Sequence, residues 1–265
     1  MLKLIGITKT FFPGTPNEHT ALRGVDLYLM PGEFVTVVGS NGAGKSTLFN
    51  AIAGSFFCEE GTILLEGKDI TYTPEYKRAR EITRIFQDPM RGTAPGLTIE
   101  ENLALAYSKS MQRHWFSPAL SRKNIQRFRE ELAKLDMGLE DRMRQPVGLL
   151  SGGQRQALTL LMATMVPPQL LLLDEHTAAL DPGTAEKVLT LTKRIVAEGN
   201  ITCLMVTHNM SQALELGTRT LMMADGGIVL DVSGPERAGM TVETLIEQFR
   251  AGTGKALDND RMLLV

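Results

Sequence analysis

The chain has 265 residues, of which 43% are hydrophobic and 22% charged, a composition ordinary for a soluble globular protein with a sizeable core. The formal net charge of −2 argues against non-specific nucleic-acid binding driven by a basic excess. Cys58 and Cys203 stand far apart and outside any CxxC pattern, so we expect two buried, reduced thiols. No stretch approaches the roughly 20 apolar residues that cross a bilayer, and residues 1–12 lack the apolar block of a signal peptide. Any work at a membrane is therefore expected to require a partner.

The first third of the chain predicts β structure and one helix. Residues 25–29 alternate apolar and polar side chains, as a half-buried strand does, and a second strand over 62–65 ends at a hairpin corner. Between them, the β-branched run 34–38 leads through a glycine-rich turn into a helix over 45–53, which Gly54 ends. Strand, glycine loop and helix in this order predict the opening of a parallel α/β layer.

The middle of the chain, roughly residues 88–150, changes to helical patterns. Thr98 and Glu101 have the spacing of a capping box at the head of a helix that runs towards Tyr107. Apolar residues at three- and four-residue spacing predict a second amphipathic helix: Ile125, Phe128, Leu132 and Leu135. We interpret this segment as a helical insertion in the α/β core.

The α/β pattern then returns. Two continuous apolar runs, 170–173 and 201–206, are typical of strands in a parallel sheet that is covered on both faces. The remaining expected elements are a helix from about 153 to Pro167, a helix over 184–198, a hairpin over 221–232 and a short helix near 242–249. The predicted fold is an α/β core with an antiparallel β subdomain and an inserted helical subdomain. It forms one domain over 1–253, with a core of about 1–87 and 151–253, a helical part of about 88–150, and a flexible tail over 254–265.

The glycine-rich turn is the strongest chemical signal, because it matches GxxxxGK[ST] in the required setting between a strand and a helix. Glycines let successive backbone N–H groups turn towards phosphate oxygens, and the following helix adds its positive N-terminal end. Lys45 is expected to reach the β- and γ-phosphates and Ser46 to coordinate Mg²⁺. The predicted nucleotide-binding residues of the loop are Gly39, Ser40, Asn41, Gly42, Ala43, Gly44, Lys45, Ser46 and Thr47.

Two further motifs supply carboxylates and a second anion site. The apolar strand over 170–173 ends in Asp174 and Glu175 at the edge of the sheet where open α/β folds bind ligands. Asp174 would hold the metal, directly or through a water, and Glu175 would accept the proton of the attacking water. The second anion site is predicted at the start of a helix, where serine is a good N-cap and exposed N–H groups attract anions. Its residues are Ser151, Gly152, Gly153 and Gln154.

These three motifs in this order resemble the nucleotide-binding domains of ABC ATPases over nearly the whole chain. The resemblance implies that Gln87 contacts Mg²⁺ and the water, that Asp181 lies in the D-loop and that His208 contacts the γ-phosphate. It also implies that Phe11, or failing that Phe12, stacks on adenine. One departure is visible, since His176 stands where most relatives carry proline after the glutamate. A local loop variation is favoured over a catalytic role for this histidine.

The resemblance also implies partners. ATP and Mg²⁺ would lie between the phosphate loop of one subunit and residues 151–154 of the other, in a head-to-tail dimer with itself or with a homologous cassette. The helical insertion would dock on transmembrane permease subunits at the inner face of the membrane, through Gln87 and the segment 90–95. Leu97, Trp115 and Phe116 could add apolar contacts, or the two aromatic residues could anchor the insertion internally.

Other classes stay open at this point. An exporter cassette, a soluble ABC ATPase without a membrane partner, and a P-loop kinase or GTPase share some of these motifs. The kinase or GTPase would lack residues 151–154, and soluble ABC proteins usually carry two cassettes or long insertions. General likeness favours an importer of a small solute such as a branched-chain amino acid or a sugar, served by an extracytoplasmic binding protein. Nothing in the sequence names the cargo.

Overall fold

The computed structural model describes residues 1–108 and 120–253, and these residues form two compact units. The first unit contains residues 1–82, 169–175 and 200 onward, and the second contains 83–168 and 176–199. The mixed α/β class predicted from the sequence is confirmed, while the predicted domain boundaries stay a prediction. Within the described ranges no helix combines the length and the apolar character needed to cross a bilayer. The predicted tail, Trp115 and Phe116 lie outside the described residues.

The first unit holds a four-stranded antiparallel sheet with the order β2-β1-β4-β5. Its long pair β1–β2 is irregular, because register shifts interrupt the pairing at several points. The apolar residues of these strands alternate into the core, as the period-two pattern predicts. The elements are β1 (Leu2–Phe11), β2 (His19–Leu29), β4 (Glu60–Leu65) and β5 (Lys68–Asp69).

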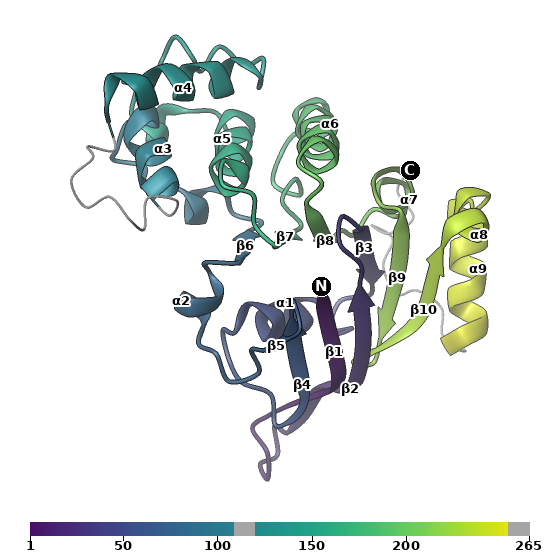
Figure 1. The fold of residues 1–265 in the computed structure, drawn as a ribbon. Helices are drawn as coiled ribbons and strands as arrows, with labels where there is room; N and C mark the ends of the chain where they lie inside the picture. The colour runs from purple at the N-terminus through teal and green to yellow at the C-terminus, as the bar shows by residue number, and fades with distance from the viewer. Residues whose placement is uncertain (109–119, 254–265) are drawn as a thin grey trace. The chain divides into compact units, whose positions relative to one another are not determined.

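The same unit holds strands of a second sheet in the order β10-β9-β3-β8-β7, in which β7, β8, β3 and β9 run parallel and β10 pairs antiparallel with β9. Alternate residues of one strand face opposite layers: Met223 belongs to the core shared with α1, and Met222 to the core shared with α7 and α9. Figure 1 shows α9 lying along β10. The elements are β3 (Phe34–Gly39), β7 (Leu170–Asp174), β8 (Thr202–Val206), β9 (Arg219–Ala224), β10 (Gly227–Ser233), α1 (Lys45–Ala53), α2 (Glu75–Arg78), α7 (Met210–Leu216), α8 (Gly234–Ala238) and α9 (Val242–Thr253).

The second unit is mainly helical. The predicted capping box is confirmed, since the Thr98 hydroxyl and the Glu101 carboxylate exchange hydrogen bonds with each other's backbone N–H group. The predicted amphipathic helix is also present, with Phe128 and Leu132 fully buried. The elements are β6 (Ile82–Ile85), whose first residue belongs to the first unit, α3 (Ile99–Ser108), α4 (Arg122–Ala133), α5 (Gly152–Thr164), α6 (Pro182–Glu198) and the 3₁₀ turns η1 (Pro89–Gly92) and η2 (Val147–Leu149).

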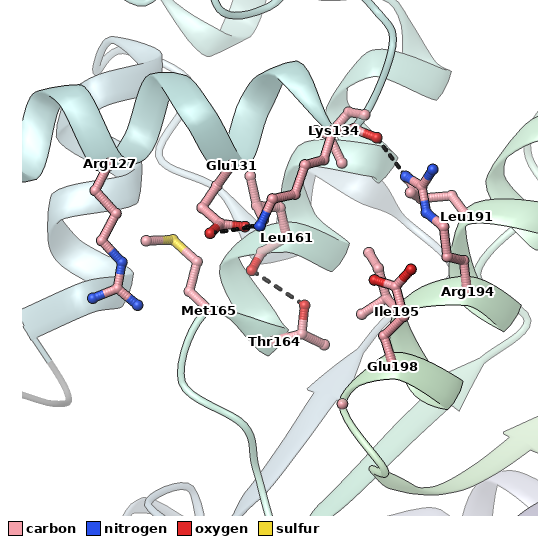
Figure 2. Close-up of a pocket in the computed structure, with 12 residues that line it drawn as sticks. Arg127, Glu131, Lys134, Leu161, Thr164, Met165, Leu191, Arg194, Ile195 and Glu198 are labelled. Atoms are coloured by element: carbon pink, nitrogen blue, oxygen red, sulfur yellow. Dashed lines mark hydrogen bonds and ion pairs between the residues drawn. The ribbon is translucent and has the colours of Figure 1, made fainter.

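An open groove of about 580 Å³ runs between α4, α5 and α6 in the second unit (Figure 2). Leu161 and Leu191 give it an apolar floor. Three of its charged side chains have partners: the Lys134 ammonium lies 2.8 Å from the Glu131 carboxylate, and the Arg194 guanidinium donates a hydrogen bond to the Lys134 carbonyl oxygen. The hydrogen bond from Arg194 therefore ties the end of α4 to α6 across the groove.

Candidate functional site

The loop between β3 and α1 requires glycine on steric grounds. Gly39 and Gly44 have φ angles of 153° and 101°, in the region that L side chains rarely adopt. A Cβ on Gly39 would lie 2.3 Å from the carbonyl oxygen of Met223, and one on Gly44 would lie 2.6 Å from that of Ala21. Helix α1 begins here without a side-chain cap, so its first N–H groups are directed at the loop. This is the arrangement that binds phosphate groups.

Lys45, the first residue of α1, is buried inside this loop. Its ammonium donates hydrogen bonds to the carbonyl oxygens of Gly39 at 2.6 Å and Ser40 at 2.9 Å. Burial lowers the pKa of Lys45, and the nearby carboxylates of Glu175 and Asp174 oppose that shift. A partly desolvated cation held beside two acids suits the binding of phosphate oxygens and a metal.

The two acids stand where β7 ends. Asp174 pairs with Val206 of the parallel strand β8, and the Glu175 N–H donates to the Val206 carbonyl at 3.1 Å. Glu175 has a φ of 48°, a left-handed conformation that costs a non-glycine residue about 1–3 kcal/mol. This turn directs its carboxylate towards His208, whose Nε2 lies 2.5 Å from Oε1 of Glu175. The predicted pair Glu175 and His208 is therefore brought together by the ends of two neighbouring strands.

A cavity of about 220 Å³ connects these groups, and every residue that lines it comes from the first unit. The phosphate loop forms one wall, and Glu175 and His208 form another. The remaining lining residues come from β1 and β2. The full lining is Phe11, His19, Ala21, Asn41, Gly42, Ala43, Gly44, Lys45, Ser46, Thr47, Glu175 and His208.

Phe11 is the aromatic residue of this cavity. Its ring packs edge-on against Phe56 at 5.5 Å, and the Lys9 ammonium lies 5.4 Å from its centroid. Phe12, the alternative considered from the sequence, is 66% exposed and does not line the cavity. His19 was missed by the sequence analysis; its position follows from its register opposite Phe11 in the β1–β2 pair. The base of a nucleotide that entered this cavity along the phosphate loop would meet the ring of Phe11.

Mg²⁺ would find oxygen ligands here. The exposed Ser46 hydroxyl lines the cavity, and the Asp174 carboxylate is close enough to the Lys45 ammonium to influence its pKa. Hydroxyl and carboxylate oxygens are the ligands that Mg²⁺ prefers in phosphate-transfer sites. The predicted third ligand, Gln87, is an exposed residue of the second unit, beyond the end of β6.

The predicted second anion site also belongs to the second unit. Ser151 caps α5 through a capping box, accepting from the Gln154 N–H at 3.3 Å and donating its own N–H to the Gln154 side chain at 3.2 Å. Gly153 leaves room for α6, since a Cβ there would lie 2.0 Å from Cγ2 of Thr184. Asp181 caps α6 by accepting from the Thr184 N–H at 3.1 Å. Hydrogen bonds from the Thr184 side chain and then from its N–H lower the pKa of Asp181.

His176 follows the catalytic candidate Glu175 directly and is buried. Burial lowers the pKa of its imidazole to about 4, so the ring is neutral near pH 7. Its Nε2 lies 3.1 Å from Oγ1 of Thr192 in α6. The histidine therefore does more than occupy a variable loop position, because it joins the loop to a helix.

A phosphate loop that begins a helix, beside a lysine and two strand-end carboxylates, defines a P-loop nucleoside triphosphatase. The sequence profile of the family described as "ABC transporter" matches residues 22–178. The chain belongs to this family of ATP-binding cassettes. It is an ATPase: it binds and hydrolyses ATP and powers a membrane transporter.

Proteins with similar sequences and structures match this chain over most of its length. The tyrosine transport ATP-binding protein of Clostridioides difficile is 42% identical over 249 residues, covering 94% of this chain and 98% of that protein. The thiamine import ATP-binding protein ThiQ of Salmonella typhimurium is 36% identical, covering 86% and 88%. A solved dimeric cassette in a post-hydrolysis state, bound to ADP and Pi, matches with a TM-score of 0.74 at 28% identity and covers 88% of this chain and 98% of that one.

Proposed function

We propose that this ATPase is the energy-coupling subunit of a membrane importer for a small solute, and that it works at the cytoplasmic face of the membrane. Relatives named for tyrosine, thiamine and bicarbonate transport support this role. The observation that carries the chemistry is the Glu175 carboxylate, which shares one cavity with the phosphate loop and lies 2.5 Å from His208.

In the proposed mechanism, the loop N–H groups and Lys45 hold the triphosphate. Glu175 accepts a proton from the attacking water, and the adjacent His208 orients the carboxylate and contacts the γ-phosphate. Ser46 and Asp174 would hold Mg²⁺, which would neutralise charge on the triphosphate, and Gln87 is proposed as a third ligand from the family resemblance alone. Phe11 would stack on the adenine ring.

Turnover is coupled to motion through a proposed dimer. Ser151 and the start of α5 would bind the γ-phosphate of the ATP held by the other cassette, so the triphosphate would bridge two subunits. Hydrolysis removes the bridge, and the subunits separate. Support comes from the dimeric form of the similar solved cassettes. The permease would contact the second unit near Gln87 and the partly exposed Met90 of η1.

The test uses Glu175→Gln, which keeps the side-chain shape but removes the base. We expect ATPase activity to fall by at least about 100-fold while ATP binding persists, so that ATP and Mg²⁺ produce a stable dimer in light scattering after gel filtration. The matched control is Glu186→Gln, an exposed glutamate on α6. Hydrolysis by Glu175→Gln at the wild-type rate would refute the role of Glu175 as the base. A Glu175→Gln protein that stays monomeric with ATP would refute the proposed dimer.

The direction of transport needs a separate experiment. The cassette and its co-purified permease are placed in vesicles with ATP and the cassette on the outside. An importer moves solute out of the lumen towards the cassette, and labelled tyrosine is the first cargo to test because of the 42% identical relative. ATP-driven movement into the lumen would overturn the import proposal in favour of an exporter.

A further inference from the structure

The residue after Glu175 has a defined hydrogen-bonding role in the fold. The Thr192 hydroxyl donates its single proton to the Val188 carbonyl at 2.8 Å, within α6. Its oxygen therefore accepts the second hydrogen bond, and His176 must donate from Nε2. Both side chains are almost completely buried, at 1% and 0% exposure. Losing the Thr192 hydroxyl would leave the Nε2–H donor of His176 unsatisfied in the interior.

This hydrogen bond bears directly on the catalytic glutamate. On its N-terminal side, Glu175 is fixed to the sheet by its N–H bond to Val206. On its C-terminal side, the next residue is fixed to α6 by the His176–Thr192 bond. The chain also passes from the first compact unit to the second at this peptide bond. Between these two anchors, Glu175 holds its left-handed φ of 48°.

A glutamate keeps a left-handed backbone conformation only where surrounding contacts hold it there, because the relaxed conformation is lower in energy by about 1–3 kcal/mol. If the C-terminal anchor is lost, Glu175 itself is free to relax from its positive φ towards an ordinary negative value. That relaxation would rotate the direction in which the carboxylate leaves the backbone. A displacement of the order of 1 Å at a reacting group can reduce a rate by about 100-fold.

We propose that His176 is a positioning residue for ATP hydrolysis: its hydrogen bond to Thr192 fixes the backbone that follows Glu175 and so directs the Glu175 carboxylate into the cavity. The inference rests on the proposed role of Glu175 as the base. His176 touches neither substrate nor metal in this role, and acts only through the peptide it shares with Glu175.

The test separates the hydrogen bond from the volume of the ring. His176→Phe keeps an aromatic ring without a donor, and Thr192→Val keeps the shape of the side chain without an acceptor. We expect each to lower kcat at least about tenfold, while KM for ATP and the Kd of ADP change by less than about twofold. Two matched variants retain the bond: His176→Gln offers an amide N–H, and Thr192→Ser keeps the hydroxyl. Both should recover at least about half of wild-type kcat.

A wild-type kcat in Thr192→Val would overturn the inference, as would a His176→Gln variant as slow as His176→Phe. Urea unfolding of each variant, run beside the kinetics, shows whether the assayed protein is folded. If His176→Phe does not fold, Thr192→Val and Thr192→Ser decide the matter. The double variant Glu175→Gln with Thr192→Val should be no slower than Glu175→Gln alone, since both act on one carboxylate. Failure of the base assignment appears separately, as wild-type turnover in Glu175→Gln.

Discussion

Replacing Gly153 by alanine tests whether this glycine serves helix packing apart from any contact with nucleotide. The added methyl carbon would lie 2.0 Å from Cγ2 of Thr184, about half of a normal carbon–carbon contact, so α5 and α6 would have to separate. Overpacking of a tight contact costs up to about 3 kcal/mol, and the better helix propensity of alanine returns about 1 kcal/mol. The free energy of unfolding should therefore fall by about 2 kcal/mol.

The measurement is urea unfolding followed by circular dichroism, without nucleotide, so that only the fold is tested. Thr184→Ser removes Cγ2 but keeps the backbone N–H that donates a hydrogen bond to Asp181. The double variant Gly153→Ala with Thr184→Ser should therefore regain at least half of the free energy of unfolding that Gly153→Ala loses. Gly96→Ala is the control, because a Cβ there meets nothing within 4 Å. The packing argument fails if Gly153→Ala is as stable as the wild type, or if Thr184→Ser does not rescue it.

Three further changes test the phosphate loop, a buried arginine and a buried histidine. Lys45→Met should weaken ATP binding at least about tenfold in titration calorimetry, because the ammonium inside the phosphate loop is lost; unchanged affinity would contradict the assignment. Arg78→Met should lower the free energy of unfolding by about 3 kcal/mol in urea, because the Arg78 guanidinium donates to the carbonyls of Ala51 and Ile52 at 2.8 Å at the end of α1; an equal midpoint and slope would refute this. His176→Gln should remove part of the acid sensitivity of the fold. Burial lowers the pKa of His176 from 6.5 to about 4, so between these values the unfolded chain binds a proton that the folded chain does not. The wild type therefore loses stability as the pH falls from 6.5 towards 4. Relative to the variant, the wild type should lose about 2 kcal/mol between about pH 7.5 and pH 5 in urea unfolding, and parallel pH curves would refute the cause.

The phosphate loop could be predicted because its chemistry is local. The strand over 34–38, the glycines and the helix that starts at Lys45 are contiguous, so sequence spacing fixes their geometry. The same holds for Asp174 and Glu175, which simply end an apolar strand. Cys58 and Cys203 are free and buried as expected, since neither pattern nor position suggested a partner.

Features that depend on register or on contacts distant in sequence could not be predicted. His19 reaches the cavity because it pairs with Phe11 across a strand pair whose register shifts several times. The contact of Gly153 with Thr184 requires the packing of two helices, which no periodicity specifies. The partner of His176 was hidden for the same reason, because Thr192 lies 16 residues away on another element.

The left-handed backbone conformation of Glu175 sets its proposed catalytic role against stability at a single residue. Glycine would adopt a φ of 48° without steric cost, and asparagine would tolerate it better than glutamate does. A search for more stable variants that ignored turnover would therefore tend to replace the side chain that we propose as the base of the reaction. Stabilising substitutions are better sought at exposed helix positions, where neither backbone strain nor the cavity is involved.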